Sequence, residues 1–212
     1  ERLADIFLEL RDKGVHNINL VTPTHYTDAI VKALERARLD IPVVWNSSGY
    51  DSVESLRELE GLVQIYMPDF KYTDSALALR YSAAPDYPEI ARAAIFEMFR
   101  QVGPFELDDD GMLRSGVLIR HLILPGAEDN SRAVIDFVAD NFPGDDVMFS
   151  LMAQYTPMPD TERFPELRKT VTAEVNDMLI EYMTQRGIYN GFWQEPCSAT
   201  DDMIPDFDLT GV

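Results

Sequence analysis

The clearest indication of the fold class is the segment Leu62-Val63-Gln64-Ile65-Tyr66-Met67-Pro68-Asp69-Phe70-Lys71-Tyr72, in which a short apolar run leads into a polar turn. A strand that is nearly continuous in apolar residues is typical of a parallel sheet covered on both faces. Asp69 and Lys71 follow this strand directly. In parallel β/α folds the carboxyl ends of the strands form the ligand site, so these two side chains are the first candidates for function.

Four more strand-like runs alternate with helical ones along the chain. The strands are predicted at 17–21, 41–45, 116–124 and 147–152. Helices are predicted from Leu3 to Leu10 and at 26–38, 53–60 (capped by Ser52), 74–80, 87–102, 130–141 and 162–186. This alternation indicates an α/β fold with a parallel sheet and right-handed crossovers. Five strands are too few for a closed eight-stranded barrel, so we expect either a partial (β/α) barrel or an open doubly wound sheet.

The chain has the size and composition of one domain. It has 212 residues, of which 46% are hydrophobic, and neither a linker nor an internal repeat divides it. We therefore predict a single domain over 1–212, with the barrel at about 1–186 and an irregular tail at 187–212. Within that tail, 187–193 is predicted to form a short extended hairpin.

Composition excludes several classes of partner. The net charge of −19 repels phosphate backbones, which excludes nucleic acid. No apolar stretch is long enough to span a membrane, and no signal peptide is present at the start. A single cysteine, Cys197, excludes an internal disulfide and fits a reducing compartment. We predict a cytoplasmic protein without a membrane partner, and the three histidines form no metal motif.

Polar residues follow all five predicted strands. Those expected to meet around one pocket are His25, Asn46, Asp69, Lys71, Arg120, His121 and Gln154. Each also has a simpler interpretation. Asp69 and Lys71 point the same way and could form a surface ion pair, and Arg120 needs a partner inside an apolar strand. His121 points to the opposite face, where a hydrogen-bonded packing role is favoured, and His25 could serve only the following helix.

The segments 17–26, 44–51, 65–72, 120–126 and 152–155 together resemble a radical SAM family, the group similar to pyruvate formate-lyase activating enzyme. The resemblance covers about residues 1–195. It implies a partial (β/α)6 barrel that binds S-adenosylmethionine and a [4Fe–4S] cluster. In that family a 5′-deoxyadenosyl radical abstracts hydrogen from a glycine of a partner enzyme, so the resemblance implies a glycyl-radical enzyme or another protein substrate as partner.

The resemblance also implies roles for individual residues. Thr22 and Thr24 stand where the family has a Gly-Gly-Glu segment that contacts the methionine amino group. Asn46 matches a polar residue that ends the next strand. Asp69 and Lys71 match an Asp-x-Lys pair near the cofactor carboxylate and the substrate, and are the implied catalytic residues. The implied carboxylate ligand is Arg120, as a bidentate fork, and Gln154 and Tyr155 lie where the adenosine would be.

One departure from the family concerns the cluster, whose iron requires thiolate ligands. The family motif Cys-x3-Cys-x2-Cys is absent here, and Cys197 cannot replace it. The chain begins in what resembles the helix after that motif, so the first strand of the barrel is expected to be missing. We therefore expect this chain alone to hold no cluster and to be inactive. The strand at 17–21 should then be a sheet edge that is covered or pairs with another chain.

Two other functions remain open from the residues alone. The first is a cluster-free barrel lyase or aldolase, in which Lys71 forms a Schiff base or Asp69 acts. The second is a non-catalytic remnant that binds a ligand or a partner protein.

Overall fold

A parallel sheet runs through the middle of the structure, a computed structural model that describes residues 1–143, 146–157 and 163–193. The strands follow the order β1-β2-β3-β5-β6-β7, with β4 paired only to β5. They are β1 (Ile18–Val21), β2 (Val43–Ser47), β3 (Ile65–Pro68), β4 (Glu106–Leu107), β5 (Leu113–Leu122), β6 (Met148–Met152) and β7 (Gly191–Trp193). Apart from β4, strands that follow one another along the chain lie side by side, as in a (β/α) barrel. The barrel is unclosed, because among the described residues β1 does not pair with β7.

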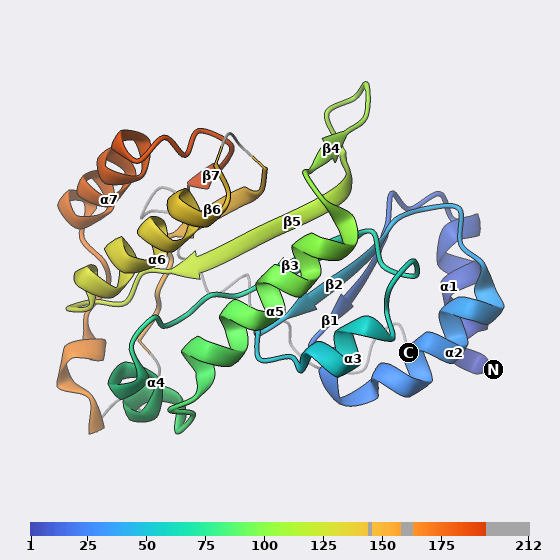
Figure 1. The fold of residues 1–212 in the computed structure, drawn as a ribbon, viewed down its shortest axis with the longest axis horizontal. Coiled ribbons are helices and arrows are strands. Elements are labelled where there is room, and N and C mark those ends of the chain that lie inside the picture. Colours follow the sequence, from blue (N-terminus) through green and yellow to red (C-terminus); the bar gives the residue numbers. More distant parts are fainter. Residues whose placement is uncertain (144–145, 158–162, 194–212) are drawn as a thin grey trace.

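Seven α-helices are described, and they connect the strands. They are α1 (Arg2–Asp12), α2 (Thr27–Ala37), α3 (Val53–Arg57), α4 (Ser75–Ser82), α5 (Tyr87–Val102), α6 (Glu128–Asn141) and α7 (Ala173–Gln185). Helices α5 and α6 cross in front of the sheet in Figure 1, and α5 contacts β3 and β5. None of the helices in the described part of the chain is long and apolar enough to cross a membrane.

The register of the strands separates a helix-facing side of the sheet from an inner side. Trp45 pairs with Tyr66, and Ile119 pairs with Phe149; all four are at most 1% exposed and belong to the core beneath the helices. Successive side chains of a strand point to opposite faces, so the residue after Trp45 and the residue after Ile119 lie on the inner side. The inner side therefore carries Asn46 and Arg120.

Several sequence predictions are confirmed. All five predicted strands form, and the helix predicted at 87–102 has those bounds as α5. Ser52 caps α3 by accepting a hydrogen bond from the backbone N–H of Ser55 at 3.1 Å. Strand β1 is an edge, because among the described residues only β2 pairs with it. Its self-association remains a prediction.

Two sequence predictions about the second half of the chain are wrong. Over its described residues, the long helix predicted at about 162–186 is instead a 3-10 turn, Pro165–Arg168, followed by α7. Thr172 caps α7 by accepting a hydrogen bond from the backbone N–H of Val175. The hairpin at 187–193 is instead β7, which pairs in parallel with β6 and so extends the sheet into the predicted tail. The structure also contains a short strand that was not predicted, β4, which pairs antiparallel with β5. Residues 194–212 of the predicted tail, including Cys197, lie outside the described residues.

The helix at 53–60 is shorter than predicted, because α3 ends at Arg57. The chain then tightens, since the N–H groups of Leu59 and Leu62 bond to carbonyls three residues back. Gly61 then adopts a φ of +80°, which ends any continuation of the helix.

Candidate functional site

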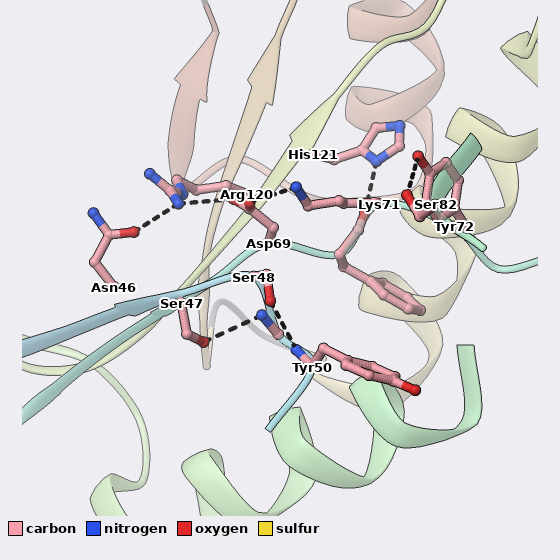
Figure 2. Close-up of polar contacts among 12 residues, drawn as sticks. Asn46, Ser47, Ser48, Tyr50, Asp69, Lys71, Tyr72, Ser82, Arg120 and His121 are labelled. Atoms are coloured by element: carbon pink, nitrogen blue, oxygen red, sulfur yellow. Dashed lines mark hydrogen bonds and ion pairs between the residues drawn. The ribbon is translucent and has the colours of Figure 1, made fainter. Parts of the chain in front are cut away.

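Four polar side chains meet on the inner side of the sheet, at the carboxyl ends of three strands (Figure 2). The Nη2 atom of Arg120 lies 2.7 Å from Oδ1 of Asn46 and 2.8 Å from Oδ1 of Asp69. The other oxygen of Asp69 lies 3.3 Å from Nζ of Lys71. Asn46, Asp69, Lys71 and Arg120 are called the inner-face network below. The predicted Asp69–Lys71 ion pair and the predicted partner for Arg120 are thus both present.

Strand pairing explains why residues so far apart in sequence meet. Asn46 pairs with Met67 in the β2–β3 ladder, two residues before Asp69. Asp69 then pairs with Arg120 in an isolated parallel bridge beyond the end of β3. Asn46, Asp69 and Arg120 therefore share one face of the sheet at nearly the same height.

The backbone that carries Asp69 is held from both sides. The N–H of Asp69 donates to the carbonyl of Ser47 at 3.0 Å, and the N–H of Phe70 donates to the carbonyl of Arg120 at 2.8 Å. The carbonyl oxygen of Asp69 lies 2.8 Å from the hydroxyl of Tyr87 on α5. Burial raises the pKa of Tyr87, so this hydroxyl keeps its proton and remains a donor.

Tyr87 and two more side chains complete the hydrogen bonds of the next two residues. The Tyr87 hydroxyl accepts from the N–H of Lys71 at 3.0 Å, and Asn130 of α6 donates to the carbonyl of Lys71 at 2.9 Å. His121 lies 2.8 Å from the carbonyl of Phe70 through Nδ1. Every backbone N–H and C=O from Asp69 to Lys71 is therefore paired. A segment so fully bonded holds its side chains in place before any ligand arrives.

His121 supports the site from the opposite face, as predicted. It is 1% exposed, and its second ring nitrogen, Nε2, lies 2.9 Å from the hydroxyl of Ser131. Bonding to a carbonyl requires the proton on Nδ1, which leaves Nε2 to accept from Ser131. Burial lowers the pKa of His121 from 6.5 to about 4, so the ring is neutral near pH 7.

This pKa predicts a loss of stability in mild acid. Because the folded pKa lies below the unfolded one, the unfolded chain binds the proton first as the pH falls below 6.5, and the loss continues to about pH 4. We expect His121 to lower the free energy of unfolding by about 2 kcal/mol between pH 7 and pH 5. Urea unfolding at both pH values would measure it in the natural chain and in His121→Gln. Equal pH-dependent losses in the two proteins would contradict the prediction.

A buried carboxylate that the sequence analysis did not single out ties together the turns after β1 and β2. Asp51 is 1% exposed and accepts hydrogen bonds from the hydroxyls of Thr24, at 2.7 Å, and of Ser47, and from the indole of Trp45 at 3.4 Å. In the same turn, Gly49 has a φ of +75°, and a Cβ at that position would overlap the carbonyl oxygen of Asp69. The turn after β2 is thus pressed against the segment that carries the network.

The other predicted site residues do not join the network. Thr24 is committed to Asp51, and Thr22 adopts a left-handed φ of 54° on the exposed turn after β1. His25 is exposed in the short 3-10 turn that precedes α2, and His121 lies on the helix-facing side. Of the seven polar residues that were expected to meet around one pocket, four therefore form the inner-face network.

The two residues predicted near the adenosine follow β6 and differ in their bonding. Tyr155 donates its hydroxyl to the carbonyl of Leu167 at 2.9 Å, and burial raises its pKa. Gln154 has a buried Oε1 with no hydrogen-bond partner among the described residues. Gln154 is therefore the one of the pair with an acceptor left for a ligand.

Arg120 has unused binding capacity. Its Nε is buried and has no hydrogen-bond partner in the part of the chain that the structure describes. The network contains two cations, Lys71 and Arg120, and one carboxylate, Asp69. One positive charge is therefore uncompensated, and a buried N–H without a partner is costly, so the arrangement suits an anionic ligand group.

The described residues contain no grouping of side chains that could hold a metal ion. Among residues 1–143, 146–157 and 163–193, no three or more His, Cys, Asp or Glu side chains are grouped closely enough to hold one. The residues that the structure describes therefore do not fit an iron–sulfur cluster.

Solved structures of other proteins share the fold of this chain. One is a domain of pyruvate-formate lyase-activating enzyme from Bacteroides vulgatus, with a TM-score of 0.60 and 16% identity over 84% of this chain and 97% of that one. Another is Streptococcus suis SuiB bound to S-adenosylmethionine, with a TM-score of 0.60 and 14% identity over 94% of this chain and 44% of that one. At these identities the likeness shows the fold alone, and the predicted partial α/β barrel with parallel strands is confirmed.

A curated protein resembles this chain in sequence over most of the chain's length. The chain is 29% identical over 184 residues to "Uncharacterized protein MJ0674" of Methanocaldococcus jannaschii. The matched region covers 85% of this chain and 49% of the relative. The chain thus spans about half the length of the curated relative it matches. No protein-family model matches the chain.

Proposed function

We propose that this chain forms the cofactor and substrate side of a radical SAM oxidoreductase, with S-adenosylmethionine bound at the inner-face network. The observation that carries the proposal is the unpartnered Nε of Arg120 beside Asn46, Asp69 and Lys71, at the strand ends of this fold. The fold likeness to activating-enzyme and S-adenosylmethionine-bound structures supports the same conclusion.

The residues of the network fit the charged end of S-adenosylmethionine. Arg120 Nε suits its carboxylate, and the oxygens of Asp69 suit its ammonium group. Both N–H groups of Arg120 Nη2 already face Asn46 and Asp69. The bidentate fork expected from the resemblance would therefore require one of these bonds to break, and we infer that Nε makes the first contact.

Fewer side chains are available to contact the adenosine end of S-adenosylmethionine. Gln154 Oε1 is buried and unpartnered, so it suits the exocyclic amino group of adenine. The hydroxyl of Tyr155 is already donated to Leu167, so its role would be limited to the face of its ring. We therefore assign the adenine contact to Gln154 alone.

The described residues do not fit the [4Fe–4S] cluster of the family. S-adenosylmethionine supplies hydrogen-abstracting radical chemistry in this family only beside a reduced cluster. We infer that the thiolate ligands of the cluster come from sequence outside these residues. A glycyl-radical enzyme as partner rests on the resemblance alone.

A Schiff-base lyase is less well supported. The side chain of Lys71 is 42% exposed and paired with Asp69. A lysine that forms a Schiff base attacks as a neutral amine, and neither solvent nor a carboxylate partner promotes that form.

Calorimetric titration of the chain with S-adenosylmethionine tests the proposal. We expect a dissociation constant below about 1 mM, and binding about 100-fold weaker for decarboxylated S-adenosylmethionine, because Arg120 would lose its anionic partner. Absence of binding at millimolar concentration, or equal affinity for the decarboxylated compound, would overturn the proposal.

A further inference from the structure

A small cavity opens beside the inner-face network. Its volume is about 180 Å³, and it is lined by Asp69, Lys71, Tyr72, Leu122, Leu124 and Met152. Leu122 and Met152 are paired in the β5–β6 ladder and lie two residues beyond Arg120 and Ser150 on the same face. The cavity therefore continues the inner side of the sheet outward from Arg120.

The lining combines an apolar body with one charged edge. Leu122, Leu124 and Met152 offer only hydrocarbon and a thioether. The hydroxyl of Tyr72 lies 3.1 Å from that of Ser82, so this phenol already has a partner. Apolar walls with a few convergent polar groups are the usual composition of small-molecule sites.

The charged edge favours an anion. Lys71 has three N–H donors, and among the described residues its only ion pair is with Asp69, at 3.3 Å. Asp69 is itself shared with Arg120 at 2.8 Å, so it compensates Lys71 only in part. A ligand carboxylate at Lys71 would use donors that the protein leaves free.

The volume limits the size of the ligand. An apolar cavity of about 150 Å³ holds a benzene molecule, so a cavity of 180 Å³ accommodates roughly six or seven non-hydrogen atoms. A glycine residue of a protein substrate has no side chain to fill an apolar cavity of this kind. The cavity is therefore better matched to a short hydrocarbon chain.

We propose that this cavity is the substrate subsite and that it takes a small aliphatic carboxylate, with its carboxylate on Lys71 and its hydrocarbon chain against Leu122, Leu124 and Met152. The role as a substrate subsite rests on the proposed function, because it assumes that S-adenosylmethionine binds at the neighbouring network. The ligand chemistry rests on the cavity itself.

Ligand-observed NMR titration of the chain, with and without S-adenosylmethionine, tests this subsite. The probes are straight-chain carboxylates from acetate to octanoate, and primary alcohols of the same lengths. We expect affinity to rise about fourfold per added methylene up to about five carbons and then to stop rising. We expect the alcohols to bind at least about 10-fold more weakly, because they lack the charge. No dependence on chain length, or equal binding of alcohols, would overturn the proposal.

Matched variants localise the binding. Leu124→Phe fills the cavity and should weaken pentanoate about 10-fold, whereas Leu107→Phe, at a 48% exposed position on β4, should have no effect. Lys71→Met should remove the preference for carboxylates over alcohols. Retained pentanoate binding in Leu124→Phe, with native thermal unfolding, would overturn the proposal.

The outcomes also separate this subsite from the proposed function. Binding of S-adenosylmethionine without any carboxylate binding would overturn the subsite alone. Carboxylate binding without S-adenosylmethionine binding would overturn the proposed function and leave an aliphatic carboxylate site. Competition between the two ligands would place the cavity in the cofactor site and overturn the substrate assignment.

Discussion

Arg120→Met is expected to weaken S-adenosylmethionine binding by about 100-fold, which is about 2.8 kcal/mol. The substitution removes the only N–H in the inner-face network that is both buried and unpartnered, and it removes one of two cations. A charge-assisted hydrogen bond contributes about 1.5–3 kcal/mol, so losing the contacts with the ligand carboxylate accounts for the effect. Calorimetric titration would measure it.

The matched control is Arg114→Met. Arg114 lies on the same strand, β5, but is exposed. This variant should bind S-adenosylmethionine like the natural chain. Because Arg120→Met also leaves Asp69 with Lys71 alone, its thermal unfolding must be recorded, and Arg120→Lys serves as a second variant that keeps the charge. If both Arg120 variants fold and bind with unchanged affinity, Arg120 does not hold the ligand.

Gly49→Ala is expected to lower the free energy of unfolding by about 3 kcal/mol or more. Gly49 has a φ of +75°, a region that costs other residues about 1–2 kcal/mol. In addition, the new Cβ would overlap the carbonyl oxygen of Asp69, which Tyr87 and the neighbouring strand hold in place. The turn or the network segment must therefore move. Urea unfolding would measure the change in stability.

Gly61→Ala separates the two causes. Gly61 has a φ of +80°, almost the same backbone conformation, but no atom lies within 4 Å of the position a Cβ would take. We expect this variant to lose only about 1 kcal/mol, from backbone strain. Equal losses in the two variants would show that the contact between Gly49 and Asp69 is unimportant.

The part of the fold that could be predicted is the part that local patterns encode. The apolar runs of the five predicted strands and the stripe along α5 each reflect burial within one element. Ser52 was identifiable as a cap because capping involves residues three apart in sequence. The mistaken helix at 162–186 had the correct apolar spacing at Leu167 and Val171, which are buried, but outside any α-helix.

The part that could not be predicted depends on contacts between distant segments. Strand β7 is only three residues long and forms because β6 offers it an edge. Tyr87 and Asn130 belong to helices α5 and α6, and nothing in their local sequence distinguishes them from other helical polar residues. Their roles become visible only when both are seen to bond the backbone of Lys71.

Local sequence patterns identified the order of the five predicted strands and of the helices between them, the carboxyl-end position of the polar residues, and the opposite orientations of Arg120 and His121. These follow from local periodicity, because alternate side chains of a strand face opposite sides. The contacts of the site became known only from the folded chain. There Asn46, Asp69 and Lys71 lie together with Arg120 in the inner-face network. Thr24 lies apart from them and donates a hydrogen bond to Asp51. The physical reason is that such contacts depend on the lateral register of β2, β3 and β5, which no single segment contains.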